Sequence, residues 1–358
     1  MGWLCPFHPP FLSSLYFSIL LVLQRNVSES TSVIINKPGT FLGKKSRRLV
    51  IKHDGLQKEY SLLKLKEITL VGSGISLSND LIEEALKQGL QINFLDGIGR
   101  VYAKIVSPLI SQTIETARAQ LQSEKSDKAG KLAKAIIDAK IGNQLALLKY
   151  FSKYQLQKAD KNFLQLTMEV AKIQSISEDL RKYKPRMENY QSLLFSFEGR
   201  ASDAYWRAFS FLLNPNVKFT GRVGRGAGDL VNSLLNYGYG ILYSRVFGEV
   251  LKAGLLPFAG FLHTDRSGKA SLVLDIMEIF RAEVVDSTVI VFLSKKKKKI
   301  EPTSEVFFEF ANQVIKRLAS KAVFADGKNY QLGKIVEMQT AIIASFLRRE
   351  GELVVFRK

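Results

Sequence analysis

Cysteine is almost absent from this sequence, whose 358 residues include only Cys5. A single cysteine cannot form an internal disulfide or a cysteine-based zinc site, so both kinds of stabilising cross-link are excluded. This scarcity fits a reducing compartment, and we expect a cytoplasmic protein. The length predicts roughly two domains of about 150 residues, and domains of this size bury enough hydrophobic core to fold without such cross-links.

Long apolar runs are also missing. The one membrane-like stretch, residues 11–23 (FLSSLYFSILLVL), is thirteen residues long, whereas a membrane-spanning helix needs about 20. No Lys or Arg precedes this stretch, and no small-residue cleavage site follows it, which disfavours a signal peptide. We therefore interpret residues 1–32 as an extension of doubtful structure and expect no stable membrane association. A weakly membrane-binding or partner-binding segment is the alternative.

Acidic residues are scarce relative to basic residues. The chain has 33 Asp and Glu against 52 Lys and Arg, which gives a formal net charge of +19. Such an excess favours a polyanionic partner, with nucleic acid ahead of an anionic membrane. With 46% hydrophobic and 24% charged residues, the composition is globular and excludes a disordered chain or a fibre.

Residues 33–107 predict a small β-rich domain. Short runs rich in β-branched residues are broken by Gly, Asn and Asp, a pattern typical of strands. Residues 96–99 (DGIG) have the chemistry of a hairpin turn. One helix is expected between the N-cap candidates Ser78 and Asn79 and the stop signal Gly89. The strand runs cover residues 33–36, 48–52, 67–72, 90–95 and 100–106.

After Pro108 the hydrophobic period changes to 3.6 residues, which predicts helices. No internal repeat of 20–50 residues is present. The predicted fold is therefore α+β, in which a small N-terminal β-sheet domain is followed by a larger all-α domain over residues 113–358. Its helices are expected at residues 113–157 (with a break near 123–127), 161–182, 198–213, 229–252, 271–292, 303–321 and 334–349.

A carboxylate lies on the core-facing stripe of the expected 198–213 helix. Apolar residues recur at helical spacing from Ala201 to Leu213, and the same spacing extended backwards reaches Glu198. A buried carboxylate requires a cation or hydrogen-bond donors. Glu198 is therefore either a functional residue or a first-turn glutamate that interacts with the positive end of the helix dipole.

Two more carboxylates, Asp275 and Glu278, share one face of the otherwise apolar segment 271–281 (SLVLDIMEIFR). Like charges at this spacing destabilise a helix unless a positive group lies beside them. That group is a metal ion or, alternatively, an Arg or Lys from a neighbouring helix. His263 ends an apolar run twelve residues before Asp275 and is a candidate metal ligand, although a lone histidine is more often structural.

Together, Glu198, His263 and Glu278 make an oxygen and nitrogen ligand set without sulfur. Such a set favours Mg²⁺ or Mn²⁺, and the imidazole tilts the choice toward Mn²⁺. In a strongly basic protein, a hard divalent cation points to phosphodiester chemistry.

Basic and aromatic residues near these positions are candidates for contacts with DNA. The glycine-rich segment 219–240 lacks a phosphate-loop motif, and we interpret it as a basic loop whose Arg222 and Arg225 hold DNA phosphates, with a plain solvated loop as the alternative. The lysine run 295–299 is expected to be a solvated loop, with direct contact to nucleic acid as the alternative. Tyr205 follows Glu198 on the same stripe and either touches a substrate or packs in the core.

These residues stand in motifs that resemble those of a known family. The motifs are FEGRASDAYW, the GR-x-x-R…DLVN-x-LLNYGYG block, GFLHTDRSGKASLVLDIMEIFR and Gln339, preceded by the strand-rich PGTFLGKKSRRLVI and EITLVGSGISLSNDLIEEALKQGLQINFLDGIGR. Over about residues 33–358 the chain is similar to the CRISPR-associated endonuclease and integrase of the spacer-acquisition (adaptation) module, which inserts new spacers into CRISPR arrays.

The resemblance implies a homodimer joined largely through its β-domains, and a heterohexamer in which two such dimers flank a small ferredoxin-like dimeric adaptation protein. It implies that Glu198, His263 and Glu278 are catalytic metal ligands, with Asp275 an additional acidic residue beside them. Lys269, inside the same motif, joins Tyr205 and the two loop arginines as a candidate contact with double-stranded DNA, the prespacer and the CRISPR repeat.

The implied reaction is transesterification, in which the 3′-hydroxyl of a prespacer strand attacks a phosphodiester at the repeat boundary. The sequence departs from the family pattern at Ala282, Ser287 and residues 226–228, none of which removes a ligand. Two alternatives remain at this point. One is a catalytically inactive DNA-binding scaffold of the adaptation complex, and the other is a structure-specific nuclease outside CRISPR adaptation.

Overall fold

The computed structural model describes residues 31–97, 99–107, 114–155, 161–224, 228–263, 267–296 and 300–358. Most of the expected N-terminal extension (residues 1–30), Arg225 of the basic loop and residues 297–299 of the lysine run lie outside these segments. None of the helices in the described segments has the length and apolarity required to cross a bilayer.

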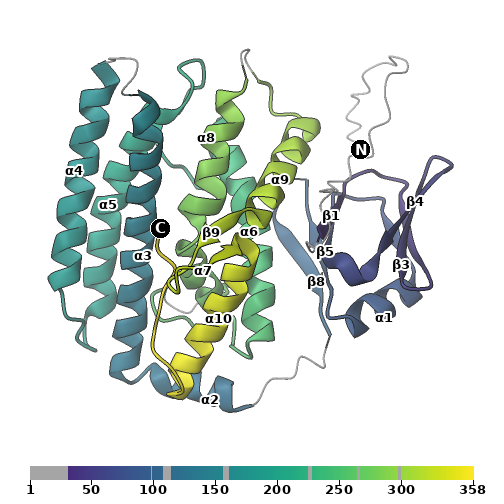
Figure 1. The fold of residues 1–358 in the computed structure, drawn as a ribbon, viewed down its shortest axis with the longest axis horizontal. Coiled ribbons are helices and arrows are strands. Elements are labelled where there is room, and N and C mark those ends of the chain that lie inside the picture. The colour runs from purple at the N-terminus through teal and green to yellow at the C-terminus, as the bar shows by residue number, and fades with distance from the viewer. Residues whose placement is uncertain are drawn as a thin grey trace, which may run out of the picture.

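The N-terminal domain consists of two sheets, each of four strands within the described residues (Figure 1). The strands are β1 (Thr31–Ile35), β2 (Phe41–Lys45), β3 (Arg48–His53), β4 (Leu56–Ser61), β5 (Leu65–Val71), β6 (Ser76–Leu77), β7 (Gln91–Leu95) and β8 (Val101–Ile105), with a 3₁₀ turn η1 (Leu62–Lys64). One sheet has the order β1-β5-β7-β8 and is parallel except for β8. The other has the order β4-β3-β2-β6, with β2, β3 and β4 antiparallel.

The β1-β5-β7-β8 sheet lies between two hydrophobic cores because successive residues of a strand point to opposite faces. Val33 and Leu70 belong to the core of the β-domain, whereas their neighbours Ile34 and Val71 join the core of the helical domain. This double burial explains why β1 and the second half of β5 are continuous apolar runs rather than alternating ones.

The predicted β-rich domain is confirmed, with strands at all five expected runs. The hairpin is present, since the amide of Gly99 donates to the carbonyl of Asp96 at 3.0 Å. The expected helix is α1 (Asn79–Lys87), capped by the Ser78 side chain and followed by Gly89 at φ +71°. The strand pattern missed β2, β4 and β6, whose sequences are short or largely polar.

The second domain is predominantly helical, as predicted. Its helices are α2 (Ile114–Ser123), α3 (Asp127–Gln155), α4 (Lys161–Lys182), α5 (Tyr190–Leu212), α6 (Leu230–Lys252), α7 (Ser271–Glu278), α8 (Ser287–Ser294), α9 (Ser304–Ala319) and α10 (Leu332–Arg348). A π-helix, η3 (Arg281–Asp286), joins α7 to α8, and a small two-stranded ladder, β9 (Lys321–Val323) and β10 (Asn329–Gln331), precedes α10. In Figure 1, α3, α4 and α5 pack side by side at the end of the molecule away from the β-domain.

Two differences from the predicted helices affect the site. Helix α5 starts at Tyr190 rather than at residue 198, so Glu198 lies about two turns inside the helix and does not interact with its N-terminal dipole. The expected 271–292 helix is interrupted by η3, which has a π-helical turn rather than an α-helical one. Such bulges change which residues share a face, and they recur at functional sites.

The C-terminal residues are held by two buried amides. The Gln339 side chain donates to the carbonyl of Val354 at 3.0 Å and accepts from the amide of Phe356 at 2.8 Å. The Asn143 side chain of α3 donates to the carbonyls of Ile279, at 2.8 Å, and of Phe356, at 3.2 Å. This tail therefore ties α10 to α3 and to the residue that follows Glu278.

The β-domain rests directly on α6. A Cβ at Gly240 would lie 1.9 Å from the carbonyl oxygen of Gly99, so only glycine permits this backbone-to-backbone contact. Beside it, the Lys104 ammonium donates to the carbonyl of Ser244 at 2.8 Å, which joins β8 to the same helix.

Candidate active site

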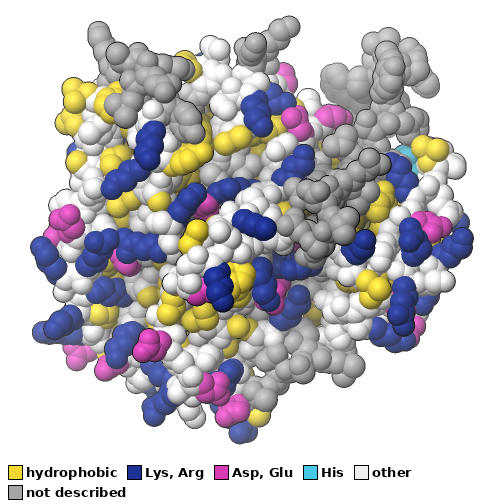
Figure 2. All heavy atoms as spheres, in the orientation of Figure 1, with side chains coloured by type: hydrophobic (Ala, Val, Ile, Leu, Met, Phe, Trp, Pro, Cys, Tyr) yellow, Lys and Arg dark blue, Asp and Glu magenta, His cyan; other side chains and the backbone are white. Residues whose placement is uncertain are grey.

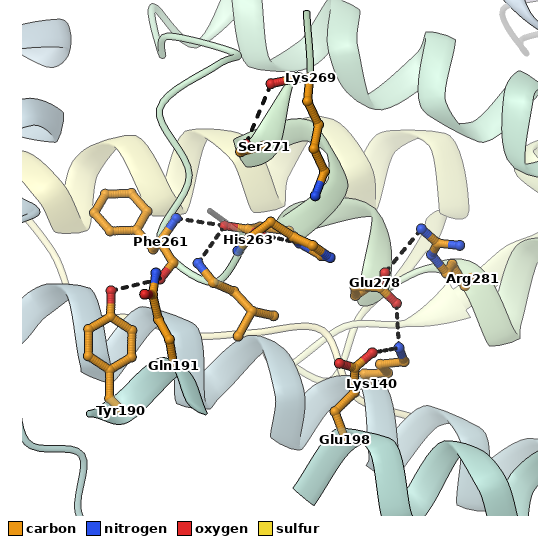
Figure 3. Close-up of polar contacts among 12 residues, drawn as sticks. Lys140, Tyr190, Gln191, Glu198, Phe261, His263, Lys269, Ser271, Glu278 and Arg281 are labelled. Carbon is orange, nitrogen blue, oxygen red and sulfur yellow. Dashed lines mark hydrogen bonds and ion pairs between the residues drawn. The ribbon is translucent and has the colours of Figure 1, made fainter. Parts of the chain in front are cut away.

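Glu198 and Glu278, which lie eighty residues apart in the sequence, meet at one buried cation. The Lys140 Nζ of α3 lies 2.5 Å from Glu198 Oε1 on α5 and 2.7 Å from Glu278 Oε2 on α7. Figure 3 shows the ammonium between the two carboxylates. The positive group required beside these acids is therefore supplied, within the described structure, by a lysine from a neighbouring helix.

Arg281 contacts the other side of Glu278. Its guanidinium lies 3.0 Å from Glu278 Oε1, and both side chains are largely enclosed. Burial acts to raise the pKa of Glu278, but Arg281 and Lys140 outweigh it and hold this pKa at about 2. Burial likewise acts to lower the pKa of Lys140, and the two carboxylates raise it instead. The site is therefore a cluster of compensating charges in which Glu278 stays ionised.

Asp275 holds the segment that carries His263. Its carboxylate accepts hydrogen bonds from the backbone amides of Phe261, Leu262 and His263 at 2.7, 2.9 and 3.0 Å. Its Oδ1 also lies 2.6 Å from His263 Nδ1. The Tyr190 hydroxyl fixes the same segment by donating to the carbonyl of Phe261 at 2.7 Å. Asp275, which is fully buried, thus fixes the position of the His263 imidazole.

The His263 side chain extends toward Glu278 in Figure 3 and lies close enough to influence the Glu278 carboxylate electrostatically. Because Nδ1 is engaged by Asp275, Nε2 is the nitrogen left for a ligand, and it has no hydrogen bond to the described residues. A carboxylate that fixes one ring nitrogen and frees the other is the usual arrangement around a metal-binding histidine.

Glu198 and Glu278 converge on Lys140, and His263 lies near Glu278, but these three candidate ligands do not form a ready-made coordination set. In the described segments, no group of three or more His, Cys, Asp or Glu side chains is arranged to hold a metal ion. Lys140 takes the place between Glu198 and Glu278 instead. The donor chemistry, two carboxylates and an imidazole, fits Mn²⁺ or Mg²⁺.

Tyr205 is fully buried, and its hydroxyl donates to Asp286 Oδ2 at 2.7 Å. The Tyr239 hydroxyl donates to Oδ1 of the same carboxylate at 2.6 Å. Burial raises the pKa of Asp286 to about 6 despite these two hydrogen bonds. The structure therefore assigns Tyr205 to the core, as the alternative interpretation had it, rather than to a DNA-contact surface.

Of the other candidate DNA contacts, Arg222 is well defined. Its guanidinium donates to the side chains of Asn232, at 3.0 Å, and Asn236, at 2.6 Å. It also lies over the Tyr239 ring, at 5.4 Å from the centroid, and Arg281 lies over this ring at 4.6 Å. This shared ring connects the basic loop to the Glu278 cluster.

Lys269 follows the His263 segment and extends toward the site in Figure 3. Its carbonyl accepts from the Ser271 amide at the start of α7, at 2.9 Å. Arg225, the remaining candidate, is outside the described residues.

Sequence reasoning missed Lys140 and Arg281. A signal for Lys140 was present, because it continues the buried stripe of α3 that contains Ala133, Ile136 and Ile137. Lys140, like Glu198, is therefore a charged residue on an otherwise apolar helical stripe. Arg281 follows Glu278 by three residues, a spacing that favours an ion pair on a helix.

The chain matches a known protein family over most of its length. The model of the CRISPR associated protein Cas1 family matches residues 33–317. The CRISPR-associated endonuclease Cas1 1 of Francisella tularensis subsp. novicida (strain U112) is 32% identical over 309 residues, which is 86% of this chain and 92% of that protein.

Two solved structures share the fold. A casposase bound to integration product has a TM-score of 0.74 at 22% identity, covering 91% of this chain and 93% of that one. A chain of a Cas6-RT-Cas1–Cas2 complex has a TM-score of 0.72 at 20% identity, covering 94% of this chain and 37% of that one. The family match places the chain among the proteins of CRISPR spacer acquisition. It belongs to the CRISPR associated protein Cas1 family.

Proposed function

We propose that this protein is a metal-dependent DNA endonuclease and integrase that inserts new spacers into CRISPR arrays. The observation that carries the proposal is the meeting of Glu198 and Glu278 at one cation beside His263. Family membership supports the same activity, since the Francisella relative is named an endonuclease. The casposase with the same fold is bound to an integration product.

The proposed reaction is transesterification. The 3′-hydroxyl of a prespacer strand attacks the phosphorus of a phosphodiester at the repeat boundary, and one new phosphorus–oxygen bond forms. The bond to the 3′-oxygen of the repeat strand breaks, and that oxygen takes up a proton as it leaves. With water in place of the prespacer hydroxyl, the same site would act as an endonuclease.

Glu198, Glu278 and Nε2 of His263 are the groups that would hold the divalent ion, Mn²⁺ or Mg²⁺. When bound, the ion supplies the charge that stabilises the phosphoryl oxygens of the transition state. Asp275 keeps the imidazole oriented through Nδ1. Arg281 keeps Glu278 ionised and in place.

The remaining basic residues would position the DNA. Lys269 and Arg222 lie on segments that border the cluster and are suited to hold phosphates, while the Asn232 and Asn236 contacts fix the direction of Arg222. Because these are phosphate contacts, they would orient the duplex without reading its sequence.

The proposed assembly is a homodimer that works with a small partner. One of the structures with this fold is a complex that contains Cas2, and we propose that a Cas2-like, ferredoxin-like dimer joins two dimers of this chain in a heterohexamer. The β-domain exposes several large apolar side chains, as a dimer contact requires. They include Leu56, Leu63 and Tyr102.

An integration assay tests the proposal. Prespacer DNA, a repeat-containing plasmid, the Cas2-like partner and Mn²⁺ are incubated with the wild type, Glu198→Ala or His263→Ala. We expect both variants to lose strand transfer while their DNA affinity stays within a few-fold of the wild type. Asp203→Ala is the matched control, since it removes an exposed carboxylate from the same helix. Strand transfer by either site variant, or by the wild type without a divalent ion, would refute the metal-site assignment.

A further inference from the structure

Lysine and arginine side chains are spread over the surface of this basic protein, as Figure 2 shows for one face. Arg281 lies deeper than most of them, because its side chain is only 23% exposed and pairs with the buried Glu278 at 3.0 Å (Figure 3). Its Nε is buried and has no hydrogen-bond partner in the part of the chain that the structure describes. One ion pair alone leaves a long side chain several rotamers, so a second contact is needed to keep the guanidinium on Glu278.

The second contact is the ring of Tyr239 on α6. The guanidinium of Arg281 lies 4.6 Å from the centroid of this ring, and Tyr239 is 6% exposed. A cation over an aromatic face is attracted by the ring quadrupole, and more strongly where both groups are desolvated. Arg222 also lies over this ring, at 5.4 Å, but it has hydrogen bonds to Asn232 and Asn236 as well. Of the two arginines, Arg281 therefore depends more on the ring.

Tyr239 is itself held in place by Asp286 of η3. Its hydroxyl donates to Asp286 Oδ1 at 2.6 Å, and the Tyr205 hydroxyl donates to Oδ2 of the same carboxylate at 2.7 Å. All three residues are buried, so the two hydrogen bonds form in a medium of low dielectric constant, where they are stronger than in water. The ring of Tyr239 therefore has a fixed position relative to η3.

The π-helical turn explains how Arg281 and Asp286 both reach Tyr239. They are the first and the last residue of η3. The backbone hydrogen bonds of a π-helix join residues five apart, which brings such a pair to the same side of the helix. In an α-helix five residues make about 1.4 turns, so the two side chains would point in different directions. The π-helix thus allows one ring to contact the guanidinium and, through its hydroxyl, the carboxylate.

We propose that Tyr239 is a positioning residue of the active site, whose ring holds the Arg281 guanidinium against Glu278 while Asp286 holds the ring. Arg281 in turn keeps the Glu278 carboxylate in one orientation. The inference rests on the proposed function, in which Glu278 holds the metal ion, and it adds a residue that acts only through Arg281. Because a small misplacement of a reacting group slows the chemical step, loss of the ring should lower the rate of strand transfer more than the affinity for DNA.

The first experiment separates the ring of Tyr239 from its hydroxyl. Tyr239→Leu removes both, and Tyr239→Met is a second variant without the ring, whereas Tyr239→Phe loses only the hydrogen bond to Asp286. For both ring-free variants we expect the strand-transfer rate at saturating DNA and Mn²⁺ to fall about tenfold, with the KM for DNA changed less than about threefold. Tyr239→Phe should keep the rate within about threefold of the wild type.

The matched control is Tyr237→Leu. It removes another buried ring from α6, one that stacks on Phe307 at 5.4 Å, and it should leave the rate per folded molecule unchanged. Equal losses of rate in Tyr237→Leu and Tyr239→Leu, measured per folded molecule, would overturn the proposal, because the effect would then come from a general loosening of α6.

A double substitution tests whether Tyr239 acts through Arg281. When Tyr239→Leu is added to Arg281→Gln, we expect the rate to fall by less than about twofold further, because the contact between the two side chains is already lost. A purely structural role of Tyr239 would instead multiply the two effects, and that result would refute the assignment.

Crystal structures of the variants give a readout that does not require strand transfer. In Tyr239→Leu the Arg281 guanidinium is expected to leave Glu278, whereas in Tyr239→Phe it should stay beside Glu278 Oε1. An Arg281 that kept its place in Tyr239→Leu would overturn the proposal even if this variant were inactive. If the wild type did not integrate DNA, the proposed function would fail, and the structures would still decide whether the ring holds the arginine.

Discussion

Replacement of Lys140 by methionine removes the cation between Glu198 and Glu278 and keeps a side chain of similar length. The ammonium lies 2.5 and 2.7 Å from the two carboxylates and is about a tenth exposed. Breaking a buried charge cluster by removing one member costs about 3–5 kcal/mol, because the partners stay buried without compensation. Arg281 still neutralises Glu278, so we expect the lower end, about 3 kcal/mol, or roughly 6–12 °C in Tm.

The same substitution is expected to tighten metal binding. A divalent ion held by Glu198 and Glu278 must displace the ammonium, and one charge at about 4 Å in an environment with an effective dielectric constant of about 20 is worth about 4 kcal/mol. We take about a third of this energy, about 1.4 kcal/mol, as the cost that the ammonium imposes on metal binding in the wild type. This energy corresponds to a tenfold change in affinity, so Mn²⁺ is expected to bind about tenfold more tightly to Lys140→Met.

Two measurements check this prediction. Calorimetric or EPR titration gives the Mn²⁺ affinity, and thermal unfolding with and without Mn²⁺ gives the stability. Lys131→Met, which changes an exposed lysine of the same helix, is the control and should leave both quantities unchanged. A folded Lys140→Met protein that binds Mn²⁺ as weakly as the wild type, or more weakly, would refute the reasoning, because the ammonium would then not compete with the metal.

Three further outcomes are expected. The pKa of Asp286, about 6, is raised above its ordinary value of 3.8 by burial, so its stabilising contribution is complete below pH 4 and is lost as the pH rises through 6. Asp286→Asn should therefore remove about 3 kcal/mol of pH-dependent stability in urea unfolding between pH 4 and 7, and an unchanged pH profile would contradict the assignment. Gln339→Ala loses two hydrogen bonds to the C-terminal residues and should cost about 2 kcal/mol, with faster carboxypeptidase digestion as the local signature. Binding of repeat duplex should weaken steeply with salt, as expected for a chain with a net charge of +19, and a flat response would argue against phosphate contacts.

Much of the fold was predictable because periodicity reports burial directly. The stripe from Ala201 to Leu213 is buried as the spacing requires, and the runs of β1, β5 and β7 are apolar because these strands are covered on both faces. The start of α5 was missed because the Asn189 side chain makes no capping hydrogen bond and leaves no clear N-terminal signal. The π-helix was also missed, since its residues (RAEVVD) are those of an ordinary helix.

The candidate site was only partly predictable. Sequence reasoning found Glu198, Asp275, Glu278 and His263 because polar residues on apolar stripes are costly unless they are partnered. It did not identify the cation that partners these carboxylates. The choice between a metal and a lysine depends on how α3 packs against α5 and α7, and the local sequence pattern does not determine this packing. Whether a metal joins this site stays a prediction for the titrations above.

The contact between Gly240 and Gly99 limits how the molecule can move. Because the two backbones touch directly, no layer of side chains lies between them that could slide or repack. A hinge motion between the β-domain and the helical domain would therefore have to break this backbone contact. The subunit should therefore move as a rigid body when it binds DNA. Spin labels placed on β3 and α4 should report the same separation before and after DNA is added, and any change in the span between two catalytic centres would then come from one subunit tilting against another.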